Sequence, residues 1–325
     1  MRSFGLLLLL ASLQTSHAAS LQPVNATITN PTNVGFYIYV PDRLQARPAV
    51  LVNPHWCHGS ARATFEGTRF ARLADAHGFL VIYPQAPRRA GDDACWDVSS
   101  RETLAHDAGG DSLGIVNMVR WAVGRYSADA GRIFVAGVSS GAMMTSTLLA
   151  AYPDVFAAGS AWAGVPFGCF AAPGTAAYGR WSDDCAAGRV ARPGPEWAAL
   201  ARAAYPGYDG WRPKVQIFHG TRDEVLDYRL FGEEVKLWTS LFGFPAEPAR
   251  TVRDSPLPGW TRSVYGPEGW FEATSAANVS HNIPVQEAVI MEWLDLACTG
   301  ESCFRWGKGG PGNPSRSSQG QSNRA

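Results

Sequence analysis

One stretch constrains the fold of this chain more than any other: "RIFVAGVSSGAMM", residues 132–144. An apolar run typical of a buried strand passes directly into Gly-Val-Ser-Ser-Gly, and then into a helix that is apolar nearly all round. The chain must turn sharply there, and side chains at Gly137 and Gly141 would collide with the neighbouring strand or helix. The pattern therefore predicts a sheet covered by helices, with the hydroxyl of Ser139 pushed outward at the turn.

The rest of the chain alternates short apolar runs with longer helical patterns. Strands are expected at 35–40, 49–53, 79–84, 132–137, 156–165, 214–220 and 261–266, and helices at 63–78, 111–126, 140–153, 228–241 and 283–297. Asp111 or Ser112 is the expected cap of its helix, and segment 166–212, which lacks clear periodicity, is interpreted as an insertion. This alternation predicts an α/β fold: a mostly parallel central sheet with helices on both faces and no separate cap domain.

Composition limits the partners. Hydrophobic residues make up 46% of the 325 positions, enough for a sizeable core. The 28 basic residues balance the 28 acidic ones and form no long run. We therefore expect no nucleic acid partner and a substrate that is neutral overall, or one for which charge matters only locally. A monomer is also expected.

The two ends of the chain differ from its middle. Residues 1–18 carry a basic Arg2, a short apolar stretch, and small residues at Ser16 and Ala18, which is typical of a secretory signal peptide cleaved after Ala18. The apolar stretch is far shorter than the ~20 residues of a membrane span. The expected organisation is a signal peptide (1–18), one domain (19–304) and a disordered Gly/Ser/Pro-rich tail (305–325), in a secreted, extracellular protein without a membrane anchor.

Secretion governs the interpretation of the six cysteines, because an even number in an oxidising compartment favours three disulfides. Proximity along the chain pairs Cys169 with Cys185 and Cys298 with Cys303, and leaves Cys57 for Cys95. Two N-x-S/T sequons, at Asn25 and Asn278, are candidate glycosylation sites.

The stretch "NPHWCHG", residues 53–59, admits two interpretations. His-x-Cys-His is compatible with a metal site, which would need Cys57 as a thiolate together with further ligands. The even cysteine count and the absence of a second His/Cys cluster in the sequence favour a disulfide instead. We therefore expect neither a metal nor a cofactor.

Ser139 needs a partner base, because a serine hydroxyl is a poor nucleophile on its own. Only two histidines follow it, His219 and His281. After a strand–turn–helix serine of this kind, the chain order is serine, then acid, then histidine. His281 satisfies that order if the acid is Asp223, which comes directly after the 214–220 strand, and His219 is then expected to be structural.

Other residues complete the predicted site. Asp227 is the second choice for the acid and Asp254 a weaker one. Two backbone N–H groups are needed to stabilise an oxyanion, and they are expected from Ser140 and from the loop after the 49–53 strand. In that loop the Cys57 amide is the first candidate, and Trp56 is the next.

Several stretches, among them "CWDVSS", "HDAGGDSLGIVNMV", "VAGVSSGAMMTSTLLAAYPDVFAAGSAWAGVP" and "HNIPVQ", resemble the fungal secreted esterases of carbohydrate esterase family one. That group includes acetylxylan and feruloyl esterases and is related to polyhydroxybutyrate depolymerases. The resemblance covers about residues 34–297 and implies an α/β-hydrolase fold, a serine esterase acting on decorated plant xylan, and the triad Ser139, Asp223 and His281. Ser280 stands where the family usually has glycine, and it creates the Asn278 sequon.

The resemblance implies removal of acetyl groups from xylan as the first candidate activity. Feruloyl esterase is the alternative, followed by a polyester depolymerase and by a catalytically silent glycan-binding protein. Trp56 and Trp162 are expected to line the substrate pocket, and Trp260 and Trp270 are candidates for stacking on sugar rings.

Overall fold

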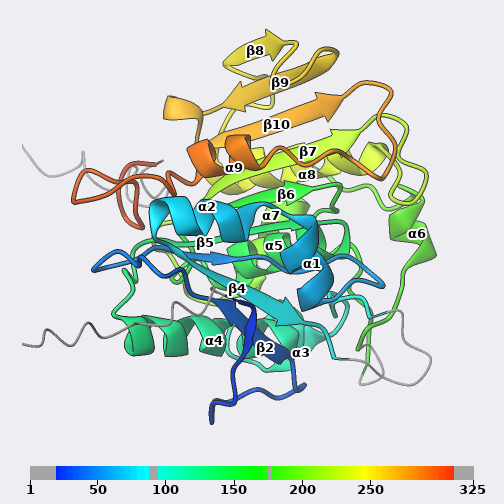
Figure 1. Cartoon of the computed structure of the whole chain (residues 1–325). Helices are drawn as coiled ribbons and strands as arrows, with labels where there is room; N and C mark the ends of the chain where they lie inside the picture. The colour runs from blue at the N-terminus through cyan, green and yellow to red at the C-terminus, as the bar shows by residue number, and fades with distance from the viewer. Residues whose placement is uncertain (1–19, 88–93, 175–177, 311–325) are drawn as a thin grey trace, which may run out of the picture.

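The computed structural model describes residues 20–87, 94–174 and 178–310 (Figure 1). The strands are β1 (Gln22–Pro23), β2 (Gly35–Tyr39), β3 (Val50–Val52), β4 (Leu80–Gln85), β5 (Ile133–Val138), β6 (Ala158–Trp162), β7 (Lys214–Gly220), β8 (Arg250–Arg253), β9 (Trp260–Tyr265) and β10 (Phe271–Ala276). The helices are α1 (Ala61–Gly67), α2 (Phe70–His77), α3 (Arg101–Leu104), α4 (Gly110–Tyr126), α5 (Ser140–Ala151), α6 (Asp183–Ala186), α7 (Gly194–Ala203), α8 (Arg229–Phe242) and α9 (Glu287–Trp293), with a 3-10 turn at Pro267–Gly269. The predicted signal peptide lies outside the described residues.

All the strands join one sheet in the order β1-β2-β4-β3-β5-β6-β7-β10-β9-β8. Its centre, from β4 to β10, is parallel. Both margins are antiparallel, with β1 and β2 on one side and β9 and β8 on the other. The prediction of a mostly parallel sheet is confirmed, and the carboxyl ends of the central strands meet at one edge of it.

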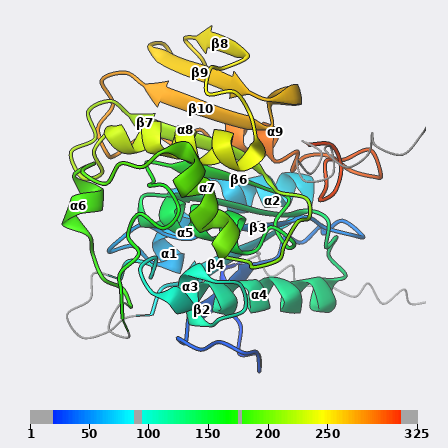
Figure 2. The ribbon, with the colours of Figure 1, turned by 180° about the vertical axis from the view of Figure 1, so that it is seen from behind.

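Helices cover both faces of the sheet because successive side chains of a strand point to opposite sides. In β5, Ile133 and Val135 belong to one buried cluster, and Phe134 and Ala136 belong to the other. The first cluster takes residues from α4, α5, α7 and α8, and the second from α1, α2 and α9. Figure 1 shows α2 and α9 in front of the sheet, and Figure 2, turned by 180°, shows α7 and α8 over the other face.

The expected 63–78 helix is two helices, α1 and α2. They are separated at Thr68 and Arg69, where the Arg69 N–H donates to the Glu287 carboxylate (3.1 Å) instead of continuing the helix. Gly78 ends α2 in the left-handed conformation that glycine favours, with φ of 73°. The interruption places Thr68 beside the cavity described below.

The expected cap of α4 is wrong. The helix begins one residue earlier, at Gly110, with Gly109 as its cap, and the side chains of Asp111 and Ser112 are fully buried in its first turn. Six helices and strands were missed: the strands β1, β8 and β10, the short helix α3, and the helices α6 and α7 within the supposedly irregular 166–212 segment. β10 matters most, since it completes the parallel centre and leads into the loop that carries His281.

The predicted tail boundary is also wrong over residues 305–310. The Trp306 backbone N–H donates to Gly131 O and its indole N–H to Pro153 O, both at 2.7 Å, so this segment is held against the domain. Residues 311–325 lie outside the described part of the chain. No helix among the described residues has the length and apolar character needed to cross a bilayer.

Candidate active site

The turn between β5 and α5 has the sharp geometry that the sequence predicts. Ser139 has φ 56° and ψ −122°, a conformation that is rare for a residue with a side chain. A Cβ at Gly137 would lie 2.4 Å from Gly141 O, and a Cβ at Gly141 would lie 2.2 Å from Pro54 O. Only glycine therefore permits this close approach of backbone to backbone.

His281 reaches Ser139 from the loop between β10 and α9. Its Nε2 lies 2.9 Å from Ser139 Oγ, and its Nδ1 lies 2.8 Å and 3.0 Å from the two carboxylate oxygens of Asp223. Because a carboxylate only accepts, Nδ1 carries the proton and Nε2 is left to accept one from the serine. The loop is seated closely on the end of β7, where a Cβ at Gly220 would lie 2.3 Å from Val279 O.

Asp223 follows β7 and has a fully buried side chain. Its Oδ1 accepts the backbone N–H groups of Val225 (2.9 Å) and Leu226 (2.7 Å). Burial opposes the negative charge, but hydrogen bonds from His219, His281 and the Leu226 N–H outweigh it and hold the pKa of Asp223 well below its usual range. The structure thus brings Ser139, His281 and Asp223 into one hydrogen-bonded chain.

The two alternative acids lie elsewhere. Asp227 pairs with Arg229, with 2.8 Å between the carboxylate and Nε, and Asp254 accepts the Gly259 N–H on an exposed turn. Neither has a hydrogen bond to His281 among the described residues. His219, expected to be purely structural, has its Nε2 only 3.2 Å from Asp223 Oδ2.

The "NPHWCHG" loop follows β3 and supports the serine turn. His55 is fully buried, its Nε2 accepts the Ala86 N–H (3.0 Å), and its Nδ1 donates to Trp56 O (2.7 Å). Cys57 is disulfide-bonded to Cys95. Since these ring nitrogens and this sulfur are all engaged, the loop does not fit the metal-site interpretation.

The other cysteines pair as expected, Cys169 with Cys185 and Cys298 with Cys303. The disulfide between Cys298 and Cys303 lies beside Asp295, in a group whose donor atoms are close enough for a metal. Bridged sulfurs are not thiolates, so this group does not fit a metal either.

Hydrogen bonds join Ser140, Trp96 and His55 next to the serine. The Ser140 Oγ accepts the Trp96 N–H, and the Trp96 indole donates to His55 O, both at 2.8 Å, so these contacts tie the loops around the turn together. The backbone N–H groups of Cys57, Trp56 and Ser140 donate to no acceptor among the described residues. These backbone N–H groups are therefore available as hydrogen-bond donors at the edge of the site.

A cavity of about 730 Å³ lies over Ser139 and His281. Trp56, Val138, Val225 and Ile283 give it apolar walls, and Thr68 and Glu287 give it a polar end. Trp181, 44% exposed, also lines it and was missed by the sequence analysis. The available signal was a large aromatic residue within the polar insertion that the Cys169–Cys185 disulfide closes.

Trp162 does not line this cavity, so its predicted pocket role is wrong. It is fully buried in β6, where it stacks on Phe218 of the neighbouring strand (ring centroids 3.7 Å apart). Trp260 and Trp270 are each 3% exposed and cannot stack on a sugar as expected. All three tryptophan side chains therefore belong to the interior of the domain.

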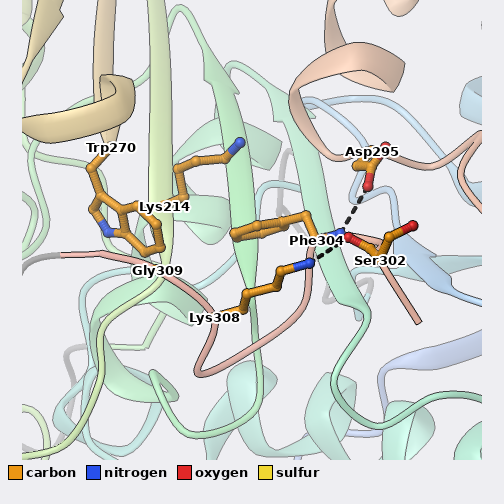
Figure 3. Close-up of a pocket in the computed structure, with 7 residues that line it drawn as sticks. All are labelled: Lys214, Trp270, Asp295, Ser302, Phe304, Lys308 and Gly309. Carbon is orange, nitrogen blue, oxygen red and sulfur yellow. Dashed lines mark hydrogen bonds between the residues drawn. The ribbon is translucent and has the colours of Figure 1, made fainter.

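Trp270 lines a smaller cavity of about 280 Å³, beside Lys214 and Phe304 (Figure 3). The Lys214 ammonium lies 4.5 Å from the Phe304 ring centroid, and burial lowers its pKa to about 8. Lys214 begins β7 whereas His219 nearly ends it. This cavity therefore lies toward the opposite edge of the sheet from Ser139.

Comparison with known proteins identifies the family. The family model described as Esterase PHB depolymerase matches residues 34–234. The chain belongs to this esterase family. Acetylxylan esterase A of Emericella nidulans is 44% identical over 266 residues, covering 82% of this chain and 86% of that protein. Feruloyl esterase B of Talaromyces funiculosus is 41% identical over 279 residues, covering 86% of this chain and 78% of that protein.

A solved structure of a family relative agrees with the fold. The acetyl xylan esterase from Aspergillus awamori superposes with a TM-score of 0.82 at 39% identity, covering 86% of this chain and 100% of that one. The predicted resemblance, the α/β-hydrolase fold and the assignment as a carboxylic ester hydrolase are confirmed. Asn25 and Asn278 are exposed, and glycosylation there stays a prediction.

Proposed function

We propose that this esterase is secreted and removes acetyl groups from acetylated xylan through an acyl-enzyme intermediate. The observation that carries the proposal is the hydrogen-bonded chain from Ser139 through His281 to Asp223, on a turn beside an open cavity. The relatives named acetylxylan esterase supply the substrate class. The three disulfides fit an oxidising compartment.

In the first half of the reaction, Ser139 Oγ attacks the acetyl carbonyl carbon while its proton passes to His281 Nε2. Asp223 holds the ring and stabilises the imidazolium that forms. The N–H groups of Ser140 and Cys57, with Trp56 as the alternative to Cys57, donate to the oxyanion. The intermediate collapses when His281 returns the proton to the sugar oxygen, and the deacetylated sugar leaves.

In the second half, water attacks the acetyl-serine ester. His281 accepts a proton from the water and then returns it to Ser139, which releases acetate. The sugar has to lie in the cavity next to the serine during both halves. The exposed aromatic face of Trp181 is suited to packing on a sugar ring there.

Feruloyl ester hydrolysis is the second candidate. A cavity of about 730 Å³ with apolar walls is much larger than an acetyl group needs, and feruloyl esterase B is a relative of comparable identity. We place acetyl ester hydrolysis first because both the 44% identical relative and the solved structure are named acetylxylan esterases.

The test measures acetate released from acetylated xylan and ferulate released from methyl ferulate by the wild-type protein and by Ser139→Ala. We expect acetate release, and a loss of at least about 10⁴-fold in Ser139→Ala with the fold intact. Ser146→Ala is the matched control, since Ser146 lies on α5 and its hydroxyl has no partner among the described residues.

An active Ser139→Ala variant would overturn the mechanism. Release of ferulate alone would move the protein to the second candidate. Release of neither product, with retained binding to xylan, would indicate a silent glycan-binding protein. Activity should also fall on the acid side, because a protonated His281 cannot accept the serine proton.

A further inference from the structure

Two histidines, rather than one, contact the buried acid. Asp223 Oδ2 lies 2.8 Å from His281 Nδ1 and 3.2 Å from His219 Nε2. The side chains of His219 and Asp223 are both fully buried. His219 lies near the end of β7, and Asp223 lies four residues later in the following loop. His219 therefore approaches the carboxylate from the strand, whereas His281 approaches it from the loop between β10 and α9.

The hydrogen bonds of His219 determine which nitrogen carries its proton. Nε2 also lies 2.8 Å from the carbonyl oxygen of Leu226, and a carbonyl can only accept. Nε2 is therefore the N–H: it donates to Leu226 O and also lies 3.2 Å from Asp223 Oδ2. Nδ1 is buried without a hydrogen-bond partner among the described residues. A second proton there would leave an unpaired donor in the core, so the ring is a neutral donor.

We infer that His219 is a positioning residue for the esterase reaction: a neutral second histidine whose Nε2–H holds Asp223 Oδ2 in line with His281. The inference rests on the proposed function of Ser139, His281 and Asp223. Asp223 Oδ1 accepts two backbone N–H groups and lies 3.0 Å from His281 Nδ1, whereas Oδ2 faces the two histidines, so His219 helps to fix the orientation of the carboxylate and to share its charge. Without His219, Oδ2 keeps only His281.

Two consequences follow for catalysis. The carboxylate gains freedom to rotate, which misplaces His281 relative to Ser139. Its charge is also less delocalised, so it favours protonation of His281 more strongly. The rate should fall, and the acid limb of the pH–rate profile should move to higher pH.

Other charged and titratable groups face this corner and are retained in the test. Glu224 accepts the His281 backbone N–H (3.1 Å), and Asp227 is paired with Arg229. Tyr228, at the start of α8, has its ring centroid 6.0 Å from that of His219. Because none of these groups is altered, a change in the profile reports on His219.

The experiment compares His219→Phe with His219→Gln. Phenylalanine fills the site without a donor, whereas glutamine offers an amide N–H near the place of Nε2. We expect His219→Phe to lower kcat/KM about 10-fold to 100-fold and to move the acid limb upward by roughly half to one pH unit, the effect of one hydrogen bond to a charged group. His219→Gln should retain most of the rate and the wild-type limb.

The matched control is His106→Phe. His106 is largely buried, with 10% of its side chain exposed, stacks on Tyr205 (3.6 Å between centroids) and donates to Ala151 O, and it has no contact with Ser139, His281 or Asp223 among the described residues. This variant should keep the wild-type acid limb. Two results would overturn the inference. One is a folded His219→Phe variant with the wild-type kcat/KM and the wild-type acid limb. The other is an equal loss of kcat/KM in His219→Phe and His219→Gln with the acid limb unmoved in both.

The outcome separates this inference from the proposed function. An active Ser139→Ala variant would contradict the proposed function. An inactive Ser139→Ala variant together with a wild-type rate and acid limb in His219→Phe would contradict only the role of His219. If the His219 variants fail to fold, ¹⁵N-histidine NMR of the native protein decides. We expect a neutral ring protonated at Nε2 throughout the active pH range, and protonation of His219 at Nδ1 would sink the idea.

Discussion

Two buried carboxyl groups, 11 positions apart on either side of the start of α8, have opposite surroundings. Asp223 accepts two backbone N–H groups and two histidines. Glu234, 1% exposed within α8, has an Oε1 with no hydrogen-bond partner among the described residues. Burial raises the pKa of Glu234 to about 8, whereas the donors around Asp223 hold its pKa well below the usual range.

The difference teaches that donors, rather than depth, decide whether a buried acid keeps its charge. Burial disfavours the anion in both places. Only at Asp223 does the fold supply enough donors to offset that cost, and only there does the proposed chemistry need a permanent negative charge. At neutral pH, this raised pKa favours the protonated form of Glu234.

The largest expected effect is that of Asp223→Asn. An amide in place of the carboxylate cannot stabilise the imidazolium of His281 and favours the wrong tautomer of its ring, so kcat should fall about 10⁴-fold. Steady-state acetate release measures this loss. Retention of a tenth of the wild-type rate would exclude Asp223 as the acid.

The same variant tests stability against pH. Because the folded-state pKa of Asp223 lies below its unfolded value, its charge stabilises the protein above about pH 4, and this contribution is lost as the pH falls toward the folded-state pKa. The contribution of this charge to the difference in free energy of unfolding between wild type and Asp223→Asn should therefore be fully present above about pH 5 and should shrink below about pH 4. Denaturant unfolding at several pH values measures it.

Glu234→Gln should have a smaller effect of opposite sign. Between about pH 4 and pH 8, folding of the wild type requires Glu234 to bind a proton that the unfolded chain has lost, so its stability falls as the pH rises. The glutamine variant avoids this cost and should be more stable by about 2–4 kcal/mol near pH 7, with the advantage vanishing below about pH 4. Its esterase activity should stay close to that of wild type, because Glu234 is not part of the candidate site.

The neighbouring Glu233 is the matched control. Its carboxylate accepts Lys236 Nζ (2.6 Å), the Trp197 indole N–H (2.7 Å) and the Arg192 N–H (3.1 Å). Burial opposes its charge, yet these partners lower the pKa of Glu233. Glu233→Gln should therefore destabilise the protein, and the same sign of change in both variants would contradict the comparison.

Asp227→Asn should have the smallest effect. This carboxylate is partly exposed and paired with Arg229, and such surface pairs contribute less than about 1 kcal/mol. Activity should be unchanged, which separates it from Asp223 four residues earlier. A large loss of kcat would reopen the choice of acid.

The serine, base and acid were predictable because chain order and position after a strand are properties of the sequence. Ser139, Asp223 and His281 each follow a strand or lie in a loop at the same sheet edge, and the structure brings them together. The cysteine pairs were predictable because two pairs are close in sequence and the third is what remains.

Side-chain direction was not predictable in the same way. Trp162 follows the serine helix closely in sequence, but its position in β6 directs the ring into the core. His219 was expected to be structural because chain order excludes it as the base. Chain order says nothing of a second donor to the acid, and that contact depends on the turn geometry after β7. β10 was missed because its sequence, "FEATSA", has little apolar character.

The close backbone contacts around the serine have a genetic consequence. Every single-base missense change of a glycine codon introduces a residue with a Cβ, and at Gly137, Gly141 and Gly220 that atom would lie 2.2–2.4 Å from backbone. A Cβ at Gly232 meets no atom within 4 Å. Single-base missense substitutions should therefore be tolerated at Gly232. None should be tolerated at the three glycines that hold the serine, its loop and the base.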